Sequence, residues 1–314
     1  MKFYKNVKKL KGDASTRIFY RKKDKKNSSI IIFSKKNKRS NLLNYDSINR
    51  ILLTNKILAP ALLSKNYRKN LIEIQDFGNK TIFKIFKKKK TNKIKIYKQI
   101  ISLLIKIQSI SQRKVINFKN EEYTVPVYTS KILENEAKLF FEWYIQKSKK
   151  IDTKKFRKSY FKIIKKLAKK INLKNDTFVH RDFHISNLMM IKNEIGIIDS
   201  QDALIGNQAY DLASLIDDVR FKTSEKLKNE IFNYYLKKRK LSDKKSFKND
   251  FDIISVLRNL KIIGVFTRLA IRDNKKKYLK LIPYAWDLIK LRSKNNNIFK
   301  DLNNLLKNHN NINK

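Results

Sequence analysis

Cysteine is absent from this chain of 314 residues, and histidine, glycine and proline are scarce, with three, five and three residues. Without cysteine the chain can form no disulfide, use no thiolate nucleophile and build no cysteine-based zinc site. Three histidines also argue against a histidine-rich metal centre.

Acidic residues are few, 27 against 75 lysines and arginines, so the formal net charge is +48. Such a balance would suit a nucleic-acid-binding protein. The lysines, however, are spread over nearly every segment. Lys, Asn and Ile have AT-rich codons whereas Gly and Pro have GC-rich codons, so a low-GC genome accounts for the bias. We therefore expect no nucleic-acid partner, although the charge favours anionic substrates through their association rates.

No apolar run approaches the length of about 18 residues that a membrane span needs. Residues 1–11 are basic, but no apolar stretch follows them, so they do not resemble a signal peptide. Hydrophobic residues make up 41% of the chain, which allows a substantial core in one bilobal enzyme or two small domains. We expect a cytoplasmic monomer with no membrane partner.

The most informative stretch lies between residues 178 and 199. The end of a buried strand leads into a polar loop, and two apolar runs follow, at 188–191 and 195–198. This pattern predicts a β-hairpin. Asp182 and Asn187 then share the loop that enters the hairpin, and Asp199 follows its second strand, so a rigid element positions all three.

These three residues suit phosphoryl transfer from ATP. The reaction needs a carboxylate that holds and deprotonates the attacking hydroxyl, and oxygen ligands for a Mg²⁺ ion on the phosphates. Asp182 suits the base, while Asn187 and Asp199 suit the metal, since Mg²⁺ prefers carboxylate and amide oxygens. The order His-Arg-Asp, four residues, Asn, then a strand and a second Asp matches the catalytic and metal loops of kinases. The alternative, a hairpin whose polar loop is only solvated, requires three metal-type ligands to coincide by chance.

Other polar residues of this region have more than one interpretation. We expect His180 to brace the loop through backbone hydrogen bonds rather than take part in the chemistry. His184 contacts substrate or caps the turn, and Arg181 faces the phosphates or forms a surface pair. Asp202 binds a substrate hydroxyl, supports the metal site or caps its own loop. The substrate-binding candidates here are Arg181, His184, Gln201 and Asp202.

Alternating polar and apolar residues before residue 34 predict three antiparallel strands, around 3–10, 18–21 and 29–33, with turns at 11–16 and 22–28. The first turn contains Gly12, Asp13 and Ser15. It is small and polar, so its backbone N–H groups can approach phosphate oxygens, but an ordinary hairpin turn fits equally well. A helix is expected at about 42–58 and a strand at 71–77.

From about residue 93 the pattern is mostly helical. Trp143 and Tyr144 suit core packing better than stacking on a sugar. Arg268 and Arg272 share a helix face and either clamp a sugar carboxylate or remain solvated surface charge. Residues 293–314, rich in Asn and Lys, are expected to form a flexible tail. The expected helices lie at 93–110, 130–147, 154–171, 212–219, 224–239, 247–272 and 276–292, with a loop at 111–129.

The motifs resemble those of the aminoglycoside phosphotransferase-like kinases, and within them the cell-wall sugar kinases that phosphorylate the anomeric hydroxyl of N-acetylmuramic acid and N-acetylglucosamine. The resemblance covers about residues 3–290. It rests on the stretch from His180 to Met189, on Ile198-Asp199-x-Gln201-Asp202-Ala203, on Tyr210-Asp211-Leu212-Ala213-Ser214-Leu215, on Gly12-Asp13-Ala14-Ser15-x-Arg17-x-Phe19-x-Arg21 and on Gly264-x-Phe266-x-Arg268-Leu269.

This resemblance implies a protein-kinase-like α+β fold with ATP and Mg²⁺ as cofactors. A small antiparallel-sheet N-lobe at 1–75 and a larger helical C-lobe at 76–292 would enclose the nucleotide. The turn with Gly12, Asp13 and Ser15 would cover the phosphates, and the backbone from Gln75 to Phe77 would contact adenine.

Two features depart from the family pattern. Ser200 replaces an aromatic residue of the subgroup, which bears on the packing beneath the metal loop, the segment from Asp199 to Ala203. Kinases generally pair a strand lysine with a helix glutamate. Here Lys35 and Lys36 follow the strand, and the next helix contains only Asp46. We therefore assign no phosphate-anchoring ion pair.

The sequence thus predicts an ATP-dependent sugar kinase of peptidoglycan recycling. One alternative is a kinase of another small alcohol, such as an aminoglycoside or choline. The other is an inactive basic RNA-binding protein on a kinase scaffold, which the presence of Asp182, Asn187 and Asp199 disfavours.

Overall fold

The structure, a computed structural model, describes residues 6–10, 17–24, 27–88, 91–149 and 154–308. Contacts within the chain divide it into two compact units. Unit 1 comprises Met1–Pro126 and Thr177–Ile205, and unit 2 comprises Val127–Asp176 and Gly206–Lys314. The stretch between residues 178 and 199 therefore belongs to the same unit as the N-terminal sheet. The division into lobes at 1–75 and 76–292 stays a prediction.

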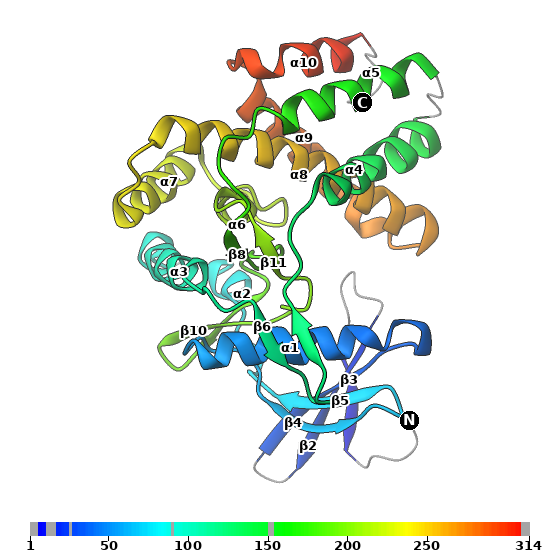
Figure 1. The fold of residues 1–314 in the computed structure, drawn as a ribbon, viewed down its shortest axis with the longest axis vertical. Coiled ribbons are helices and arrows are strands. Elements are labelled where there is room, and N and C mark those ends of the chain that lie inside the picture. The colour runs from blue at the N-terminus through cyan, green and yellow to red at the C-terminus, as the bar shows by residue number, and fades with distance from the viewer. Residues whose placement is uncertain (1–5, 11–16, 25–26, 89–90, 150–153, 309–314) are drawn as a thin grey trace. The chain divides into compact units, whose positions relative to one another are not determined.

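Unit 1 contains a five-stranded antiparallel sheet with the order β1–β2–β3–β5–β4 (Figure 1). Isoleucines on β3 and β5 face each other across the ladder and form one apolar face. Helix α1, Ser40–Thr54, packs Leu42 and Tyr45 against that face. The strands are Val7–Lys9 (β1), Ile18–Asp24 (β2), Asn27–Phe33 (β3), Leu62–Asn66 (β4) and Leu71–Gln75 (β5).

The sequence predicted most strands of this sheet but placed some of their ends incorrectly and missed one strand. The predicted turn at 22–28 was too long, because β2 and β3 continue to pair as far as Asp24 and Asn27. The predicted strand at 71–77 ends at Gln75. Strand β4 was missed, because it is an edge strand whose middle residues are exposed and carry little apolar alternation.

The connection to the catalytic region is mainly helical. A short 3₁₀ turn, Lys36–Lys38 (η1), precedes α1, and helix α2 covers Ile82–Phe86. Helix α3, Lys93–Gln108, confirms the helix predicted at 93–110 and buries one apolar stripe. The predicted loop at 111–129 contains a small hairpin of β6, Lys114–Ile116, and β7, Glu122–Thr124. Those short strands are largely exposed, so the sequence pattern gave no sign of them.

The predicted catalytic hairpin is confirmed. Strand β9, Leu188–Ile191, pairs antiparallel with β10, Glu194–Ile197. The buried strand before the loop is β8, Thr177–Val179, which pairs with β11, Leu204–Gly206.

Unit 2 is helical. The helix predicted at 130–147 changes character at its middle, where α4 gives way to a π-helical segment, η2. The helix predicted at 212–219 begins earlier, at Ala209. The elements are Ser130–Leu139 (α4), Phe140–Ser148 (η2), Lys154–Ala168 (α5), Ala209–Ile216 (α6), Glu225–Arg239 (α7), Lys244–Arg272 (α8), Lys276–Leu281 (η3), Ile282–Ser293 (α9), Asn297–Phe299 (η4) and Lys300–Lys307 (α10).

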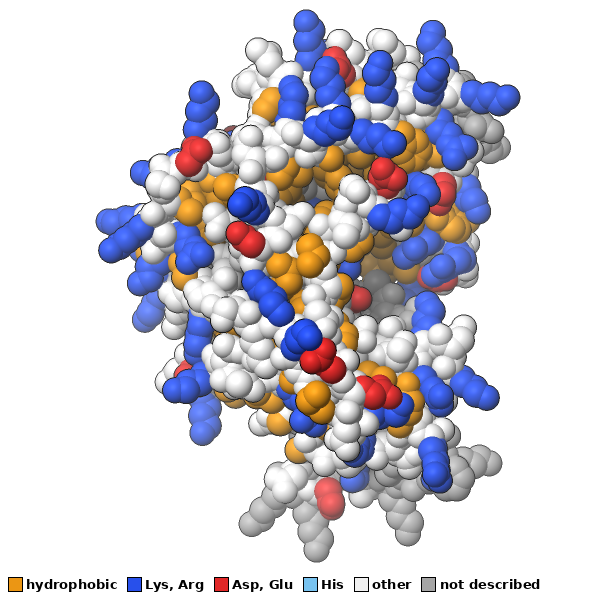
Figure 2. Space-filling view, viewed as in Figure 1, with side chains coloured by type: hydrophobic (Ala, Val, Ile, Leu, Met, Phe, Trp, Pro, Cys, Tyr) orange, Lys and Arg blue, Asp and Glu red, His pale blue; other side chains and the backbone are white. Residues whose placement is uncertain are grey.

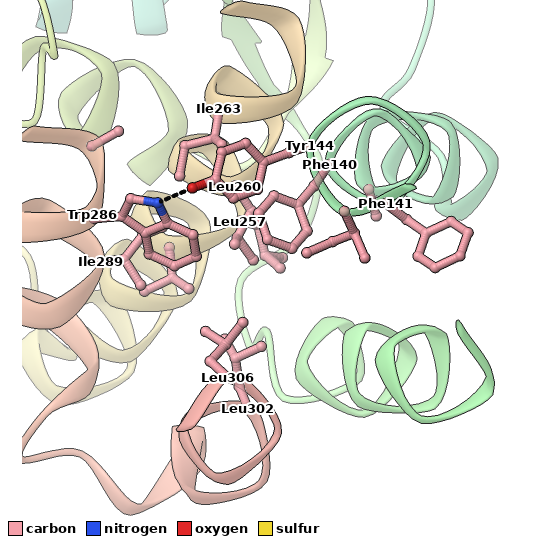
Figure 3. Close-up of a cluster of buried hydrophobic side chains, with 14 of the residues drawn as sticks. Phe140, Phe141, Tyr144, Leu257, Leu260, Ile263, Trp286, Ile289, Leu302 and Leu306 are labelled. Carbon is pink, nitrogen blue, oxygen red and sulfur yellow. Dashed lines mark hydrogen bonds between the residues drawn. The ribbon is translucent and has the colours of Figure 1, made fainter. Parts of the chain in front are cut away.

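Aromatic rings occupy the centre of unit 2 (Figure 3). The rings of Phe140 and Tyr144 lie 5.5 Å apart, and Trp286 Nε1 donates a hydrogen bond of 3.2 Å to the Tyr144 hydroxyl. Tyr144 is therefore a core residue, as predicted. Trp143 is half-buried instead, with the Lys147 ammonium 4.1 Å from its ring centroid.

The segment expected to be a flexible tail contains ordered structure. Within residues 293–314, η4 and α10 form, and Phe299, Leu302 and Leu306 are buried in the unit 2 core. An amphipathic helix of 8 residues gives little periodic signal in a segment rich in Asn and Lys. Within the described residues, no helix combines the length and apolar character that crossing a membrane requires.

The basic side chains do not gather in one place on the face drawn in Figure 2, where blue lysines and arginines are scattered over most of the surface. This distribution agrees with the dispersal of lysine along the sequence.

Candidate active site

The hairpin register explains why residues distant in sequence meet at one end of it. Leu188 pairs with Ile197, so Asn187 and Ile198 continue the ladder in the direction of the loop. The Ile198 amide donates a hydrogen bond of 3.0 Å to the Asn187 carbonyl. Asp199 is therefore brought beside the loop that carries Asp182.

Hydrogen bonds within the loop hold Asp182 in place. Asn187 Nδ2 donates to the Asp182 carbonyl at 3.0 Å, and the His184 amide donates to the same carbonyl at 3.0 Å. Arg181 has a positive φ of 72°, which turns the chain sharply just before Asp182. The Nδ2 of Asn187 is thus engaged with the loop.

Asp199 is held by an arginine from the N-terminal sheet. Arg17, immediately before β2, places Nη2 at 2.6 Å from Asp199 Oδ1 and donates through Nη1 to Gln201 Oε1 at 2.6 Å. Gln201 Nε2 in turn donates to Asp202 Oδ2 at 2.6 Å. The Arg17 side chain is 5% exposed and the Asp199 side chain 33% exposed. One guanidinium thus links β2 to the metal loop.

Helix α1 supports the same loop from beneath. Tyr45 lies 5.8 Å from the Arg17 guanidinium carbon, measured to its ring centroid. Buried Ser200 donates a hydrogen bond to Asn49 Oδ1, and Asn49 Nδ2 donates to the Pro60 carbonyl at 2.9 Å. Ser200, which departs from the family pattern, therefore joins the metal loop to α1 by a hydrogen bond.

Burial and neighbouring charges shift two pKa values at the site. Desolvation raises the pKa of Asp199, and the carboxylates of Asp182 and Asp202 raise it further, while Arg17 opposes them. Burial lowers the pKa of His180 to about 4, although Asp182 and Asp202 pull the other way. His180 is therefore neutral at pH 7 and completely buried. Its burial suits a structural role, whereas bracing of the loop through backbone hydrogen bonds stays a prediction.

The segment after β5 packs on the catalytic hairpin. A Cβ added to Gly196 of β10 would lie 2.9 Å from the Phe77 ring, so the ring covers that glycine. The Gln75 amide donates to the Ala61 carbonyl at 2.9 Å, and Asp76 is held by Arg21 with Nε at 2.6 Å. Residues 75–77 are thus anchored in the same unit as the metal loop.

The donor set fits a magnesium ion. Within the described residues, no three His, Cys, Asp or Glu side chains gather as a self-sufficient metal centre. Mg²⁺ does not require one, because it takes one or two protein oxygens and completes its shell with water and phosphate oxygens. Asp199 and Asn187 offer those oxygens. The carboxylates of Asp182 and Asp202, which raise the pKa of Asp199, also favour a cation there.

Two of the predicted substrate-binding residues, His184 and Gln201, are buried and contact other side chains of the same unit. His184 is buried, and its Nε2 lies 3.5 Å from Asn187 Nδ2, which suits a brace of the turn. Gln201 is 5% exposed and bonded to Arg17 and Asp202, whereas Asp202 and half-buried Arg181 remain accessible. Gly12, Asp13 and Ser15 lie outside the described residues, and Arg268 belongs to unit 2.

Sequence reasoning missed three residues that contact the metal loop: Arg17, Tyr45 and Asn49. Arg17 was visible as part of the N-terminal motif, but nothing in the pattern connected it to Asp199. Tyr45 and Asn49 are four residues apart and therefore share a face of α1. Their polar groups interrupt the apolar residues of that face, which is the signal that could have identified them.

Comparison with known proteins defines the class. The profile of the phosphotransferase enzyme family (APH) matches residues 89–245, which include the catalytic loop, the hairpin and Asp199. The chain belongs to this family and is a phosphotransferase of the kinase type. The protein-kinase-like α+β fold expected from the sequence is confirmed by solved structures. Aminoglycoside phosphotransferase APH(2'')-Ib bound to ADP has a TM-score of 0.60 at 15% identity, over 91% of this chain and 95% of that one.

The names of the sequence relatives also state an acceptor. An N-acetylmuramate/N-acetylglucosamine kinase of Neisseria meningitidis serogroup B is 26% identical over 279 residues, 87% of this chain and 81% of that protein. Three further bacterial relatives have the same name. Among solved structures, amicoumacin kinase hAmiN in complex with AMP-PNP, Ca²⁺ and amicoumacin has a TM-score of 0.62 at 14% identity, over 91% of this chain and 88% of that one.

Proposed function

We propose that this protein uses ATP to phosphorylate the anomeric hydroxyl of N-acetylmuramate and N-acetylglucosamine. The observation that carries the chemistry is the convergence of Asp182, Asn187 and Asp199 at one end of the β9–β10 hairpin. The names of the curated relatives support the choice of acceptor. An ATP-dependent step in peptidoglycan recycling would take place in the cytoplasm.

Asp182 orients the attacking hydroxyl in this proposal. A carboxylate oxygen of Asp182 accepts a hydrogen bond from the sugar hydroxyl and takes its proton as the hydroxyl oxygen bonds to the γ-phosphorus. The bond from the γ-phosphorus to the β–γ bridging oxygen breaks, and ADP is the leaving group. Two hydrogen bonds to the Asp182 carbonyl keep its backbone fixed during this step. Neutral His180 beneath the loop adds no charge that would compete for the Asp182 carboxylate.

Asn187 Oδ1 and the Asp199 carboxylate would hold Mg²⁺, which, when bound, neutralises charge on the nucleotide phosphates. We further propose that the turn containing Gly12, Asp13 and Ser15 covers those phosphates, and that the backbone from Gln75 to Phe77 contacts the adenine. Arg181, His184, Gln201 and Asp202 remain proposed contacts of the substrate.

The acceptor's charge is one basis for choosing among alcohols. N-acetylmuramate is a carboxylate, whereas choline and aminoglycosides are cations that aromatic or acidic groups would bind. Arg268 of α8 is half-buried, and its Nε is a buried donor with no hydrogen-bond partner in the part of the chain that the structure describes. Arg272 is instead paired with Asp273 through Nε and Nη2 at 2.8 and 2.9 Å. Of the two arginines that share this face, Arg268 therefore suits a carboxylate better.

The proposal is tested by ATP turnover on a panel of N-acetylmuramate, N-acetylglucosamine, the methyl glycoside of N-acetylglucosamine, choline, ethanolamine and kanamycin. We expect turnover of both free sugars, with a phosphorus resonance coupled to the anomeric proton. The methyl glycoside is the matched control, because it differs only in blocking the anomeric hydroxyl.

Two variants test the residue roles. Asp182→Asn should lower kcat by about a thousandfold while nucleotide binding is kept. Asp199→Asn should abolish the magnesium dependence of nucleotide binding. Phosphorylation of the methyl glycoside would refute the anomeric position, and turnover of choline or kanamycin alone would refute the sugar assignment. Salt-sensitive RNA binding without any turnover would favour the inactive scaffold.

A further inference from the structure

The usual phosphate anchor of kinases has no counterpart in the described part of this chain. Protein kinases pair a strand lysine with a helix glutamate so that the lysine holds the nucleotide phosphates. Here Lys35 and Lys36 are exposed after β3. The acidic residue of α1, Asp46, accepts hydrogen bonds from Arg50 Nε and the Phe118 amide, both at 2.8 Å. Asp46 is thus fully engaged inside its own unit.

Arg17 provides a buried positive charge at the metal loop. Its guanidinium carbon lies 5.5 Å from the Phe19 ring centroid and 5.8 Å from that of Tyr45, and its two Nη atoms bond to Asp199 and Gln201. A buried cation requires an anionic partner, and the fork of an arginine binds carboxylate and phosphate groups equally well. The residue is therefore equipped to exchange one anion for the other.

Two cations, the Arg17 guanidinium and the proposed Mg²⁺, can bind the Asp199 carboxylate. Arg17 Nη2 lies 2.6 Å from Asp199 Oδ1, and the same carboxylate is the ligand proposed for Mg²⁺. A metal on Asp199 weakens the ion pair with Arg17, because the two cations repel each other. Arg17 then needs another anion, and the nucleotide phosphates arrive with the metal.

We propose that Arg17 is an exchange cation: it pairs with Asp199 in the nucleotide-free protein and binds the nucleotide phosphates once a divalent metal occupies Asp199. Arg17 thereby replaces the strand lysine and helix glutamate of other kinases. This inference rests on the proposed function, since it requires a metal–nucleotide substrate.

The test compares two ligands of Arg17→Gln, neither measured through turnover. Removing the guanidinium unmasks Asp199, so Mn²⁺ should bind the nucleotide-free variant about tenfold more tightly, as measured by electron paramagnetic resonance of free Mn²⁺. Mg²⁺–AMP-PNP should bind about tenfold more weakly by calorimetry, because a phosphate contact is lost. The two affinities therefore move in opposite directions.

Two further variants make the result interpretable. Arg17→Lys keeps the charge but not the fork, so both affinities should return part of the way to wild type. Arg50→Gln is the matched control, because it removes an arginine from α1 whose partner is Asp46. Neither affinity should change in that variant. Thermal unfolding of each variant checks that it is folded.

Distinct outcomes overturn distinct claims. If Mn²⁺ and Mg²⁺–AMP-PNP both bind Arg17→Gln more weakly, Arg17 only supports the loop and the exchange is wrong. Unchanged Mn²⁺ affinity would likewise exclude competition at Asp199. If Arg17→Gln fails to fold, an Arg17→Lys variant with wild-type affinities for both ligands overturns the inference. A wild-type protein that binds no Mg²⁺–AMP-PNP would instead refute the proposed function itself.

Discussion

Lowering the pH from 7 to 5 should destabilise this protein through one residue, His180. The ring is completely buried, packs edge-on against Phe183 at 6.4 Å between ring centroids and is neutral because burial lowers its pKa to about 4. In the unfolded chain the same ring has the ordinary value of 6.5. Folding therefore excludes a proton that the unfolded chain would accept at pH 5.

The sign and the size of the change in stability follow from the pKa values of His180 in the folded and unfolded chain. Between pH 6.5 and pH 4 the unfolded chain binds more protons than the folded protein, so stability rises with pH across this window and is complete above it. The gap corresponds to about 3 kcal/mol once the pH is below 4, and about 2 kcal/mol of this is lost between pH 7 and pH 5. Asp199, whose pKa is raised, opposes this loss, because the folded protein holds its proton more tightly.

The chain offers a clean assay because it has only three histidines. Ring resonances in heteronuclear NMR, assigned with His180→Gln and His184→Gln, should show that the His180 ring stays neutral at pH 5. Urea unfolding followed by circular dichroism at pH 7 and pH 5 then gives the loss of stability. The difference between wild type and His180→Gln isolates the His180 contribution from those of the carboxylates, and His184→Gln is the matched control.

A His180 ring that titrates near pH 6.5 in the folded protein would contradict this prediction. So would a His180→Gln variant that loses as much stability as wild type between pH 7 and pH 5, since the acid sensitivity would then come from other groups.

Three further perturbations follow from the packing. Asp217 accepts hydrogen bonds from Arg292 and Ser255 in the core of unit 2, and the charge of Arg292 helps to lower its pKa to about 2 against the effect of burial. Asp217→Asn should therefore lower the free energy of unfolding by about 3 kcal/mol, measured by denaturation followed through tryptophan fluorescence. Gly264→Ala puts a Cβ 2.3 Å from backbone atoms and should lower the melting temperature more than Gly196→Ala, whose Cβ meets side chains that can shift; equal effects would contradict this. Ser200→Ala should cost about 1–3 kcal/mol, because the Oδ1 of buried Asn49 loses its donor; a neutral result in urea unfolding would mean that water replaces it.

The catalytic hairpin was predictable because its pairing is local. The apolar runs of β9 and β10 are close in sequence, and their register alone brings Asn187 next to Asp199. The Asp182 loop enters the same hairpin. Side chains that depend on one short ladder can therefore be placed from the alternation of polar and apolar residues.

Elements that are only weakly buried were not predicted, because their sequences lack this alternation. Strand β4 and the β6–β7 hairpin expose much of their surface, so their sequences carry little periodic signal. The expected flexible tail failed in the same way, because the few apolar residues of α10 matter only when the rest of unit 2 covers them.

The sequence by itself determined the hairpin and placed Asp182, Asn187 and Asp199, the proposed base and metal ligands, at one end of it, since residues so close along the chain have few ways to be arranged. Only the tertiary structure decided which distant side chains contact this region. Arg17 reaches Asp199 across 182 positions, and Ser200 reaches Asn49 across 151. Such contacts depend on how the sheet and α1 pack around the metal loop. Arg17, Ser200 and Asn49 are buried there and need polar partners, which no local sequence pattern identifies.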